Sequence, residues 1–279
     1  MSALILTGKE PAQKLLDGLR DKVEKLDPKL VIVQVGDDAS SASYIRKKME
    51  STRAIGMRSE HLHLPSDTSF EALVDTVRSL NDNPDVSAFL VQSPLPKHLH
   101  SRYPEVMREV DPKKDADGFT AYNVGKMFLS AEYEHLAPAT ASAVIEMLSF
   151  YAVPVEGKHV VIVGRSNIVG KPLAVMLINR GATVTVCNSK TKDLGAITSQ
   201  ADILISAVGK PKLITVDMVK KGAVVIDVGI TRDEEGLKGD VDFETVNEIA
   251  SAISPVPGGV GPLTVACLLR NCVRAKERQ

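Results

Sequence analysis

The chain has 279 residues, enough for two domains that each bury a core of their own. Its 34 Lys and Arg residues nearly balance its 35 Asp and Glu residues, so no overall field favours nucleic acid or an anionic membrane. Tryptophan is absent and aromatic residues make up only 4%, which leaves few rings on which single-stranded bases stack. We therefore expect no nucleic-acid partner.

Cysteine spacing and apolar runs indicate a cytoplasmic protein. The three cysteines (Cys187, Cys267, Cys272) show no C-x-x-C spacing and suggest a reducing compartment. No apolar run approaches the length needed to span a bilayer, and the N-terminal segment has neither a basic region nor a clear cleavage site. For lack of such a run we expect no membrane partner. The histidines have no cysteine or acid partner at ligand spacing, so we expect no metal site either.

Strand-like and helix-like segments alternate almost throughout, which predicts parallel sheets with helical crossovers. The helices show apolar residues at a period near 3.6, and the strands are short apolar or alternating runs. In the first half we expect helices at 9–26, 41–55, 70–80 and 141–151, and strands at 30–35, 59–64 and 86–91. The helix at 141–151 crosses into a second unit.

The second unit contains strands near 159–163, 182–187, 203–208 and 223–228, a Pro/Gly-rich loop at 254–262 and a final helix from 263 to about 275. Proline-rich segments near Pro138 and in this loop indicate where the chain crosses between domains. We predict an α/β protein with a catalytic α/β domain at 1–138 plus 262–279, made discontinuous by the last helix. A Rossmann-like dinucleotide-binding domain occupies 139–261, with a cleft between the two.

The most informative stretch is HVVIVGRSNIVGKP, at 159–172. A run of β-branched residues stops at Gly164, a second glycine follows at Gly170, and Pro172 is well placed to open a helix. This order predicts a buried strand, a glycine turn and a helix N-terminus, which offer free backbone N–H groups to a phosphate. It differs from the usual G-x-G-x-x-G because Ser166 stands at the second glycine position and the last glycine sits one residue late.

The end of the next strand indicates which dinucleotide the turn would bind. Enzymes that use NAD normally place an acid there to accept from the ribose 2′-hydroxyl. Here no acid appears until Asp193, and the available groups are Ser189, Lys190 and the guanidinium of Arg165. Arg holds a phosphate through two donors at once, which suits a 2′-phosphate. We predict NADP rather than NAD, against the alternative that Arg165 and Lys190 are solvated surface charges.

Three places in the first half carry polar groups near the ends of expected strands, where open α/β sheets bind ligands. Tyr44 and Lys48 form an i,i+4 pair on one helix, and a lysine beside a ring can be partly desolvated, with a lowered pKa. Gln92 ends an apolar strand, and Asp117 precedes a glycine at a turn. Locally, such lysines are usually solvated, and acid-glycine pairs are mostly turn chemistry.

Taken together, these segments resemble the bifunctional methylenetetrahydrofolate dehydrogenase/cyclohydrolase family over nearly the whole chain. Each motif is modest alone, but their order and spacing make the match specific. The motifs are the segment from Tyr44 to Lys48, VQSPLP (91–96), KDADGF (114–119), GRSNIVGKP (164–172), CNSKT (187–191), DVGI (227–230), GDVDF (239–243) and PVPGGVGP (255–262).

The resemblance implies a homodimer in which a tetrahydrofolate derivative lies in the cleft between a folate-binding catalytic domain and an NADP-binding domain. It implies oxidation of 5,10-methylenetetrahydrofolate to 5,10-methenyltetrahydrofolate, followed by hydrolysis to 10-formyltetrahydrofolate. These steps belong to one-carbon metabolism, which serves purine and amino-acid biosynthesis.

The resemblance also implies roles for individual residues. Lys48 matches the catalytic lysine, and Gln92 the amide that bonds and tunes it. Tyr44 matches the ring that stacks on the folate, and Asp117 the carboxylate that pairs with the pterin's nitrogen donors. The substrate site further includes Val91, Pro257, Gly258, Gly259, Val260 and Gly261. The cofactor site comprises Gly164, Arg165, Ser166, Ser189 and Ile230, joined by Lys190 and Thr140.

The chemistry fits these residue types. Oxidising the methylene bridge needs no strong base, because the folate nitrogen supplies the electrons that expel hydride, and orientation therefore provides much of the catalysis. Hydrolysing the methenyl cation needs an activated water and a protonated nitrogen, which one lysine of lowered pKa serves.

Several positions depart from the family pattern. The family's usual P-C-T-P-x-G reads Pro-Ala-Thr-Ala-Ser-Ala at 138–143, which removes a proline and a glycine at a domain crossing. Ser93, Asn188 and Ala116 replace a leucine, a frequent histidine and a valine. None of these changes removes a group with a named chemical role, but they leave the balance of the two activities open.

Three other readings stay open at this stage. A dehydrogenase with weak cyclohydrolase activity is disfavoured by the presence of both Lys48 and Gln92. A catalytically silent folate or nucleotide sensor is disfavoured by the same lysine. Another Rossmann oxidoreductase, acting on shikimate-like acids, would account for 159–230 but not for the motifs of the first half.

Overall fold

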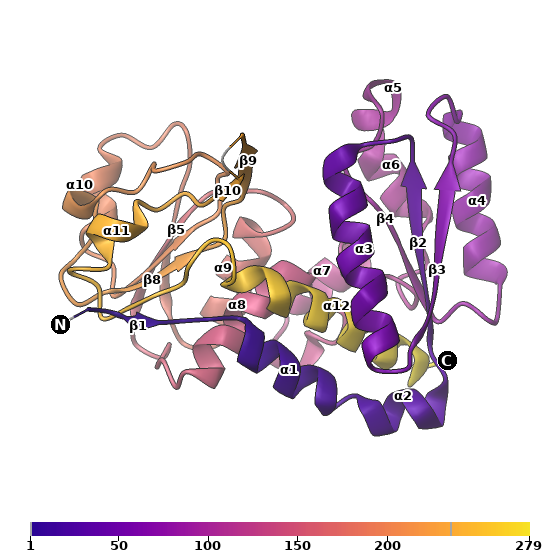
Figure 1. The fold of residues 1–279 in the computed structure, drawn as a ribbon, viewed down its shortest axis with the longest axis horizontal. Coiled ribbons are helices and arrows are strands. Elements are labelled where there is room, and N and C mark those ends of the chain that lie inside the picture. The colour runs from indigo at the N-terminus through magenta and orange to yellow at the C-terminus, as the bar shows by residue number, and fades with distance from the viewer. Residues whose placement is uncertain (1, 235) are drawn as a thin grey trace. The chain divides into compact units, whose positions relative to one another are not determined.

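The structure is a computed structural model of the chain that describes residues 2–234 and 236–279 (Figure 1). It separates into two compact units. Unit 1 contains the residues up to Gln13, Met127–Ala131 and Thr140–Thr264. Unit 2 contains Lys14–Lys126, Glu132–Ala139 and Val265–Gln279.

A sheet with the strand order β1-β11-β8-β7-β5-β6 forms the centre of unit 1, and each neighbouring pair in it is parallel. Its strands are β1 (Leu4–Ile5), β5 (His159–Val163), β6 (Thr183–Cys187), β7 (Ile203–Ser206), β8 (Val224–Asp227) and β11 (Ala252–Ile253). The chain passes from β5 to β6 on one side and continues with β7 on the other. The point between β5 and β7 is therefore the switch point at which doubly wound sheets bind ligands.

Helices and a short hairpin connect these strands. They are α8 (Ala139–Phe150), α9 (Gly170–Ile178), α10 (Leu194–Thr198) and α11 (Phe243–Val246), with the antiparallel strands β9 (Thr231–Asp233) and β10 (Gly236–Lys238). The strands supply apolar residues to the core because both faces of a parallel sheet are covered. Val161, Leu204 and Val225 of three adjacent strands pack in one buried cluster.

Unit 2 has a smaller parallel sheet in the order β3-β2-β4. Its strands are β2 (Lys29–Val35), β3 (Arg58–Leu64) and β4 (Ala88–Val91). Its helices are α2 (Arg20–Leu26), α3 (Ala39–Ala54), α4 (Phe70–Asp82), α5 (Lys97–His100) and α6 (Tyr103–Glu109). Two further helices, α1 (Lys9–Asp17) and α12 (Val260–Lys276), begin in unit 1 and end in unit 2, whereas α7 (Ala121–Met127) runs from unit 2 into unit 1.

Local chemistry sets the limits of the two long helices of unit 2. Asp38 caps α3 by accepting from the N–H of Ser41 at 2.8 Å, and Ser69 caps α4 by accepting from the N–H of Ala72 at 3.1 Å. After α3 the chain turns at Gly56, whose φ of +77° favours glycine. Alternate residues of β2 and β4 then pack against α4, with Phe89 1% exposed in this cluster.

The two-domain α/β fold with a Rossmann-like parallel sheet is confirmed, and most expected elements lie within a few residues of their predicted limits. The single helix expected at 9–26 is instead two helices, α1 and α2, with Gly18 between them. Glycine disfavours continuation of a helix, and Leu19 packs in the core at the break.

The predicted domain limits differ from the observed units at the N-terminus. Residues before Gln13 were expected in the first domain, but Leu4 and Leu6 donate to the carbonyls of Ser251 and Ile253 at 2.9 and 2.8 Å. These bonds add β1 to the sheet of unit 1. A two-residue strand has no periodicity to detect, which explains why the sequence pattern missed both β1 and β11. The last helix belongs to unit 2 from Val265 onward.

Within the described residues, no helix combines the length and the apolar character needed to cross a membrane.

Phe89 provides a test of the unit 2 core. We expect Phe89→Ala to lower the free energy of unfolding of unit 2 by about 3–5 kcal/mol, because it leaves a cavity between β4 and α4. Hydrogen exchange of the β2 and β4 amides measures this quantity for unit 2 alone. Tyr122→Ala, at a side chain 60% exposed in the same unit, is the matched control and should change it by no more than about 0.5 kcal/mol. Equal effects of the two changes would contradict the assigned core.

Candidate functional site

Lys48 and Gln92 meet at the carboxyl edge of the sheet in unit 2. Gln92 directly follows β4, and Lys48 lies on α3, which follows the adjacent strand β2. The Lys48 Nζ donates to the Gln92 Oε1 at 3.0 Å. The Gln92 Nε2 donates to the carbonyl of Ser93 at 2.8 Å, so the amide is oriented with its oxygen toward the amine. The pair predicted from the sequence is therefore in direct contact.

Asp117 is brought to the same edge by a short segment beside β4. Phe89 donates to the carbonyl of Lys114 at 2.9 Å and accepts from the N–H of Ala116 at 3.1 Å, so this segment extends the sheet by one bridge. Because the bridge is parallel, the chain leaves it at the edge where β4 ends and Gln92 begins. We call Lys48, Gln92 and Asp117 the Lys48 cluster.

A buried carboxylate fixes the turn that carries Asp117. Asp115 is 1% exposed and accepts from the N–H groups of Gly118, Phe119 and Thr120 at 2.8, 3.2 and 2.7 Å. Three backbone donors on one carboxylate leave the turn little freedom. Sequence reasoning did not assign Asp115 a role, although it lies in the KDADGF motif.

A second support comes from the far end of the chain. Asn271, on α12, is 1% exposed, and its Nδ2 donates to the carbonyls of Ala116 and Ala137, each at 2.9 Å. The first of these carbonyls immediately precedes Asp117. No local pattern around Asn271 signals this contact, because its partners lie more than 130 residues earlier in the chain.

Burial and charge shift the pKa values of the Lys48 cluster in opposite directions. Burial lowers the pKa of Lys48, and the negative charge of Asp117 partly counteracts this effect. Burial raises the pKa of Asp117, while the charge of Lys48 opposes the shift and that of Asp115 adds to it. The amine is thus held near a carboxylate in a poorly solvated place, where its neutral form is easier to reach than in water.

Tyr103 is an additional residue near the cluster. Its hydroxyl donates to the carbonyl of Val91 at 3.4 Å. Burial raises its pKa, and the charges of Asp117 and then Asp115 raise it further, so the phenol stays protonated. Tyr103 lies at the start of α6 with no motif around it, and sequence reasoning missed it.

The remaining predicted substrate residues divide between the units. Tyr44 lies one helical turn before Lys48 on α3, and its ring is 39% exposed. Val91 is buried at the end of β4. The five residues from Pro257 to Gly261 belong to unit 1, where the first three lie in the turn after β11 and the last two open α12. There Gly8 donates to the carbonyl of Gly258 at 2.8 Å.

The glycine turn of unit 1 lies at the switch point of its sheet. Gly164 ends β5 with a φ of +124°, and a side chain there would overlap the carbonyl of Ala207, which follows β7. The two strand ends approach so closely that only glycine fits. Ser166 accepts from the N–H groups of Val169 and Gly170 at 3.1 and 3.4 Å, which orders the turn before α9.

The turn keeps free donors, as the sequence predicts. The N–H groups of Arg165, Asn167 and Ile168 donate to no acceptor in the part of the chain that the structure describes. Together with the N-terminus of α9, they form a surface suited to an anionic phosphate.

The other predicted cofactor residues surround this region of unit 1. Ser189 and Lys190 are exposed after β6, and Arg165 is exposed in the turn itself. Asp193, the first acid after β6, caps α10 by accepting from the N–H of Ala196 at 3.3 Å. Its carboxylate is therefore already engaged as a helix cap.

Ile230 and Thr140 complete the predicted cofactor set. Ile230 is 39% exposed in the loop after β8. Thr140 is half-buried in the first turn of α8, where Ala141 and Ala143, which replace the family's proline and glycine, are fully buried.

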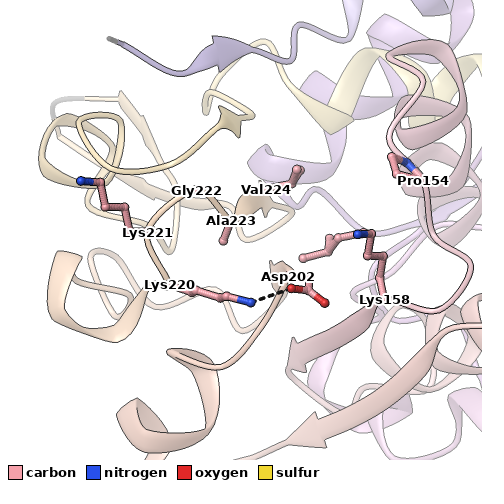
Figure 2. Close-up of a pocket in the computed structure, with 9 residues that line it drawn as sticks. Pro154, Lys158, Asp202, Lys220, Lys221, Gly222, Ala223 and Val224 are labelled. Atoms are coloured by element: carbon pink, nitrogen blue, oxygen red, sulfur yellow. Dashed lines mark hydrogen bonds and ion pairs between the residues drawn. The ribbon is translucent and has the colours of Figure 1, made fainter.

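A hollow at the opposite edge of the unit 1 sheet contains none of the predicted residues. It has a volume of about 270 Å³ and lies at the amino ends of the strands, lined by Lys158, Lys220 and Gly222 among others (Figure 2). Lys220 forms an ion pair with Asp202 at 2.7 Å, so one of the cations that line the hollow is already neutralised. Parallel sheets bind ligands at their carboxyl ends, and we assign this hollow no role in the reaction.

Comparisons with known proteins match both halves of the chain. Residues 138–279 match the family model for the tetrahydrofolate dehydrogenase/cyclohydrolase NAD(P)-binding domain, and residues 6–117 match the model for the catalytic domain of the same family. The chain is 46% identical over 280 residues to the bifunctional protein FolD of Exiguobacterium sibiricum, covering 99% of this chain and 100% of that protein.

Solved structures agree. The bifunctional enzyme FolD, a methylenetetrahydrofolate dehydrogenase/cyclohydrolase from Campylobacter jejuni, superposes with a TM-score of 0.95 at 41% identity, covering 99% of both chains. The Trypanosoma brucei enzyme, solved in complex with NADP cofactor and an inhibitor, has a TM-score of 0.94 at 36% identity, covering 100% of this chain and 98% of that chain.

The charge of Asp117 should be measurable at Lys48. We expect Asp117→Asn to lower the pKa of Lys48 further, because the carboxylate that favours the ammonium is lost. Acetylation of the Lys48 amine, followed by mass spectrometry across a pH series, reports that pKa, and its midpoint should move to lower pH. Asp75→Asn, at an exposed carboxylate on α4, is the control and should leave the midpoint in place. A midpoint that stays fixed or rises in Asp117→Asn would show that the two charges do not interact.

Proposed function

This chain belongs to the tetrahydrofolate dehydrogenase/cyclohydrolase family, and we propose that the Lys48 cluster and the glycine turn carry its two activities. It is a bifunctional enzyme that oxidises 5,10-methylenetetrahydrofolate to 5,10-methenyltetrahydrofolate with NADP and hydrolyses the product to 10-formyltetrahydrofolate. The residues that perform each step are our assignment, and the 3.0 Å bond between Lys48 and Gln92 is the observation that supports it most directly.

Lys48 is the residue we assign to hydrolysis. The oxygen of a water molecule adds to the methenyl carbon while the neutral amine takes its proton. The bond from that carbon to the folate N5 then breaks as the added hydroxyl loses its proton and becomes the formyl C=O on N10. The electron pair left on N5 takes a proton from the ammonium, and one proton is released to solvent overall. A lysine suits both transfers only when its pKa is lowered toward the working pH, which is the direction that burial gives here.

Gln92 is assigned to hold the amine in place. Its oxygen accepts from Nζ whether the amine is charged or neutral, because both forms have N–H donors. A neutral amide also adds no charge that would stabilise the ammonium. The arrangement supports an amine that is positioned without being locked in its protonated state.

Asp117 and Tyr44 are assigned to substrate binding. In the part of the chain that the structure describes, the Asp117 carboxylate accepts no hydrogen bond, and its pKa is raised by burial. Such an acceptor gains from a ligand that supplies N–H donors, as a pterin does. The exposed ring of Tyr44, on the same face of α3 as Lys48, offers a surface for stacking. Val91 of unit 2 is a further proposed substrate contact, and so are Pro257 to Gly261 within unit 1.

The glycine turn of unit 1 fits a dinucleotide phosphate. It offers free N–H groups at a helix N-terminus and at the switch point of the sheet. A dinucleotide held there would supply the nicotinamide acceptor for the hydride of the methylene carbon. This chain contributes orientation through Gly164, Ser166, Ile230 and Thr140, which we propose as cofactor contacts.

The choice of NADP rests on the groups after β6. Ser189 and Lys190 are exposed there, Arg165 is exposed in the glycine turn after β5, and Asp193, the first acid after β6, caps α10. Cationic donors favour a 2′-phosphate over a 2′-hydroxyl.

Assembly and location are part of the proposal as well. A homodimer is supported by exposed apolar side chains in unit 1, with Phe128, Leu129 and Ile178 at 67%, 70% and 57% exposure. They are near each other, because Asn179 donates to the carbonyl of Met127 at 2.8 Å. We propose a cytoplasmic enzyme that acts without nucleic acid, in agreement with its balanced charge, and that supplies one-carbon units for purine and amino-acid biosynthesis.

Lys48→Met tests the assignment of the hydrolytic step. We expect it to abolish cyclohydrolase turnover, a loss of at least about 100-fold, because the amine assigned to the proton transfer is lost. Following methenyltetrahydrofolate absorbance measures the rate. Lys47→Met, the same change at an exposed neighbour, is the control and should keep the rate. Full hydrolytic turnover in Lys48→Met would remove Lys48 from the mechanism.

Cofactor preference has its own test. We expect the unmodified enzyme to have a lower KM for NADP than for NAD. Arg165→Ala should raise the KM for NADP by about tenfold, because one charge-assisted bond to the 2′-phosphate is lost. The KM for NAD should stay unchanged. Initial rates of reduced-cofactor formation with each dinucleotide measure both constants. Lys158→Ala, at the amino end of β5, is the control. Equal or better use of NAD by the unmodified enzyme would refute the prediction.

A further inference from the structure

Two buried carboxylates of unit 1 have no part in the assignments above. Asp227 is the last residue of β8 and is 3% exposed. Asp240 follows β10 and is fully buried. Among the described residues, no lysine or arginine forms an ion pair with either one, and both accept hydrogen bonds from neutral donors. We call the two residues the carboxylate pair.

Asp240 holds the loop that follows β7. Its Oδ2 accepts from the hydroxyl of Ser206 at 2.8 Å and from the N–H of Val208 at 2.7 Å. Its Oδ1 accepts from the N–H of Lys210 at 2.7 Å. Three short hydrogen bonds to one buried carboxylate fix the backbone from 206 to 210.

Asp227 holds the loop that follows β8. Its Oδ1 accepts from the N–H of Gly229 at 3.0 Å, and its Oδ2 accepts from the N–H of Val241 at 2.8 Å. The second bond attaches Asp227 to the segment that contains Asp240. The two carboxylates therefore fix two neighbouring loops through one shared piece of backbone.

Two glycines make room for the carboxylate pair. A side chain at Gly229 would overlap the carboxyl group of Asp240, and one at Gly239 would overlap that of Asp227. Each carboxylate thus packs directly on the backbone beside the other. Both glycines lie in motifs, DVGI and GDVDF, that the sequence singled out for resemblance alone.

Burying two carboxylates next to each other costs free energy, which the hydrogen bonds to the loop N–H groups offset. Burial raises the pKa of Asp227 to about 7, its backbone donors oppose the shift, and the charge of Asp240 adds to it. A buried apolar pair would avoid this cost but would leave the loop N–H groups without acceptors.

The loops they fix carry exposed apolar side chains at the carboxyl edge of the sheet. Val208, after β7, is 46% exposed, and Ile230, after β8, is 39% exposed. Thr231 donates to the carbonyl of Gly209 at 2.9 Å and joins the two loops. Gly164 of the glycine turn abuts the carbonyl of Ala207, just before Val208. The fixed loops are thus continuous with the proposed dinucleotide site.

We propose that Asp240, with Asp227 beside it, is a positioning residue for the dehydrogenase reaction. The pair sets the backbone at 208–210 and the position of Ile230, and thereby shapes the surface on which the dinucleotide rests. This inference rests on the placement of NADP in unit 1 under the proposed function. It assigns no role to the pair in hydrolysis, which uses the Lys48 cluster of unit 2.

Asp240→Asn is the direct test. The amide places an N–H₂ group against N–H donors, so at least one loop bond is lost and the loop shifts. We expect the Kd for NADP, measured by calorimetry, and the KM for NADP to rise by about tenfold, equivalent to about 1.4 kcal/mol of binding. Cyclohydrolase turnover with methenyltetrahydrofolate should stay within twofold of the unmodified enzyme.

Two further variants keep the test decisive. Asp242→Asn makes the same change two residues away, at a carboxylate that binds Thr245 and Lys212 outside the pair, and should leave NADP binding unchanged. Ser206→Ala removes one donor to Asp240 without introducing a clash, and should weaken NADP binding by a smaller factor. Ser206→Ala decides the question if Asp240→Asn fails to fold.

The outcomes separate the inference from the function on which it rests. Weaker NADP binding with retained hydrolysis supports the positioning role. An unchanged Kd in folded Asp240→Asn and Ser206→Ala overturns it, as does an equal loss of both activities, which would mean that the pair only stabilises the protein. Failure of the unmodified enzyme to bind NADP would instead refute the proposed cofactor site.

Discussion

A lysine amine serves as an acid and a base only where the surroundings disfavour the ammonium without leaving the amine unpaired. At Lys48, burial lowers the pKa of the amine, and the neutral amide of Gln92 accepts from it at 3.0 Å. The negative charge of Asp117 partly opposes the lowering of that pKa. Stronger pairing with a carboxylate would lock the proton on nitrogen. The proposed role of Lys48 depends on the arrangement of unit 2, in which three separate segments supply the three groups at one sheet edge.

Parallel sheets meet that need in both units, because their loops gather at the carboxyl edge. In each unit a buried aspartate then organises a loop by accepting from its backbone N–H groups. Asp115 does so for the turn that carries Asp117, and Asp240 does so for the loop that carries Val208. Backbone donors have fixed geometry, so a carboxylate that accepts two or three of them sets a loop more firmly than apolar packing does.

Sequence patterns predicted the strands and helices with clear periodicity and drew attention to Lys48 and Gln92, whereas the role of Asp117 followed only from the resemblance to the family, because an acid before a glycine is mostly turn chemistry. The helical spacing from Tyr44 to Lys48 and the strand end at Gln92 are local features, which is why they were visible. The patterns failed where the signal is short or distant. The strand β1 has two residues, and the bond from Asn271 to the carbonyl of Ala116 spans 155 positions. Neither leaves a trace in neighbouring residues.

The sequence by itself determined the two-domain α/β class, the glycine turn at Gly164 and the lack of an acid directly after β6, because each depends on residue types within a short window. The tertiary structure decided what those residues contact: the amide oxygen at Lys48, the carbonyl at Gly164, and the N–H groups held by Asp115 and Asp240. Hydrogen bonds and desolvation depend on distances of a few ångströms between segments far apart in the chain. Only folding sets those distances, and with them the pKa of the amine.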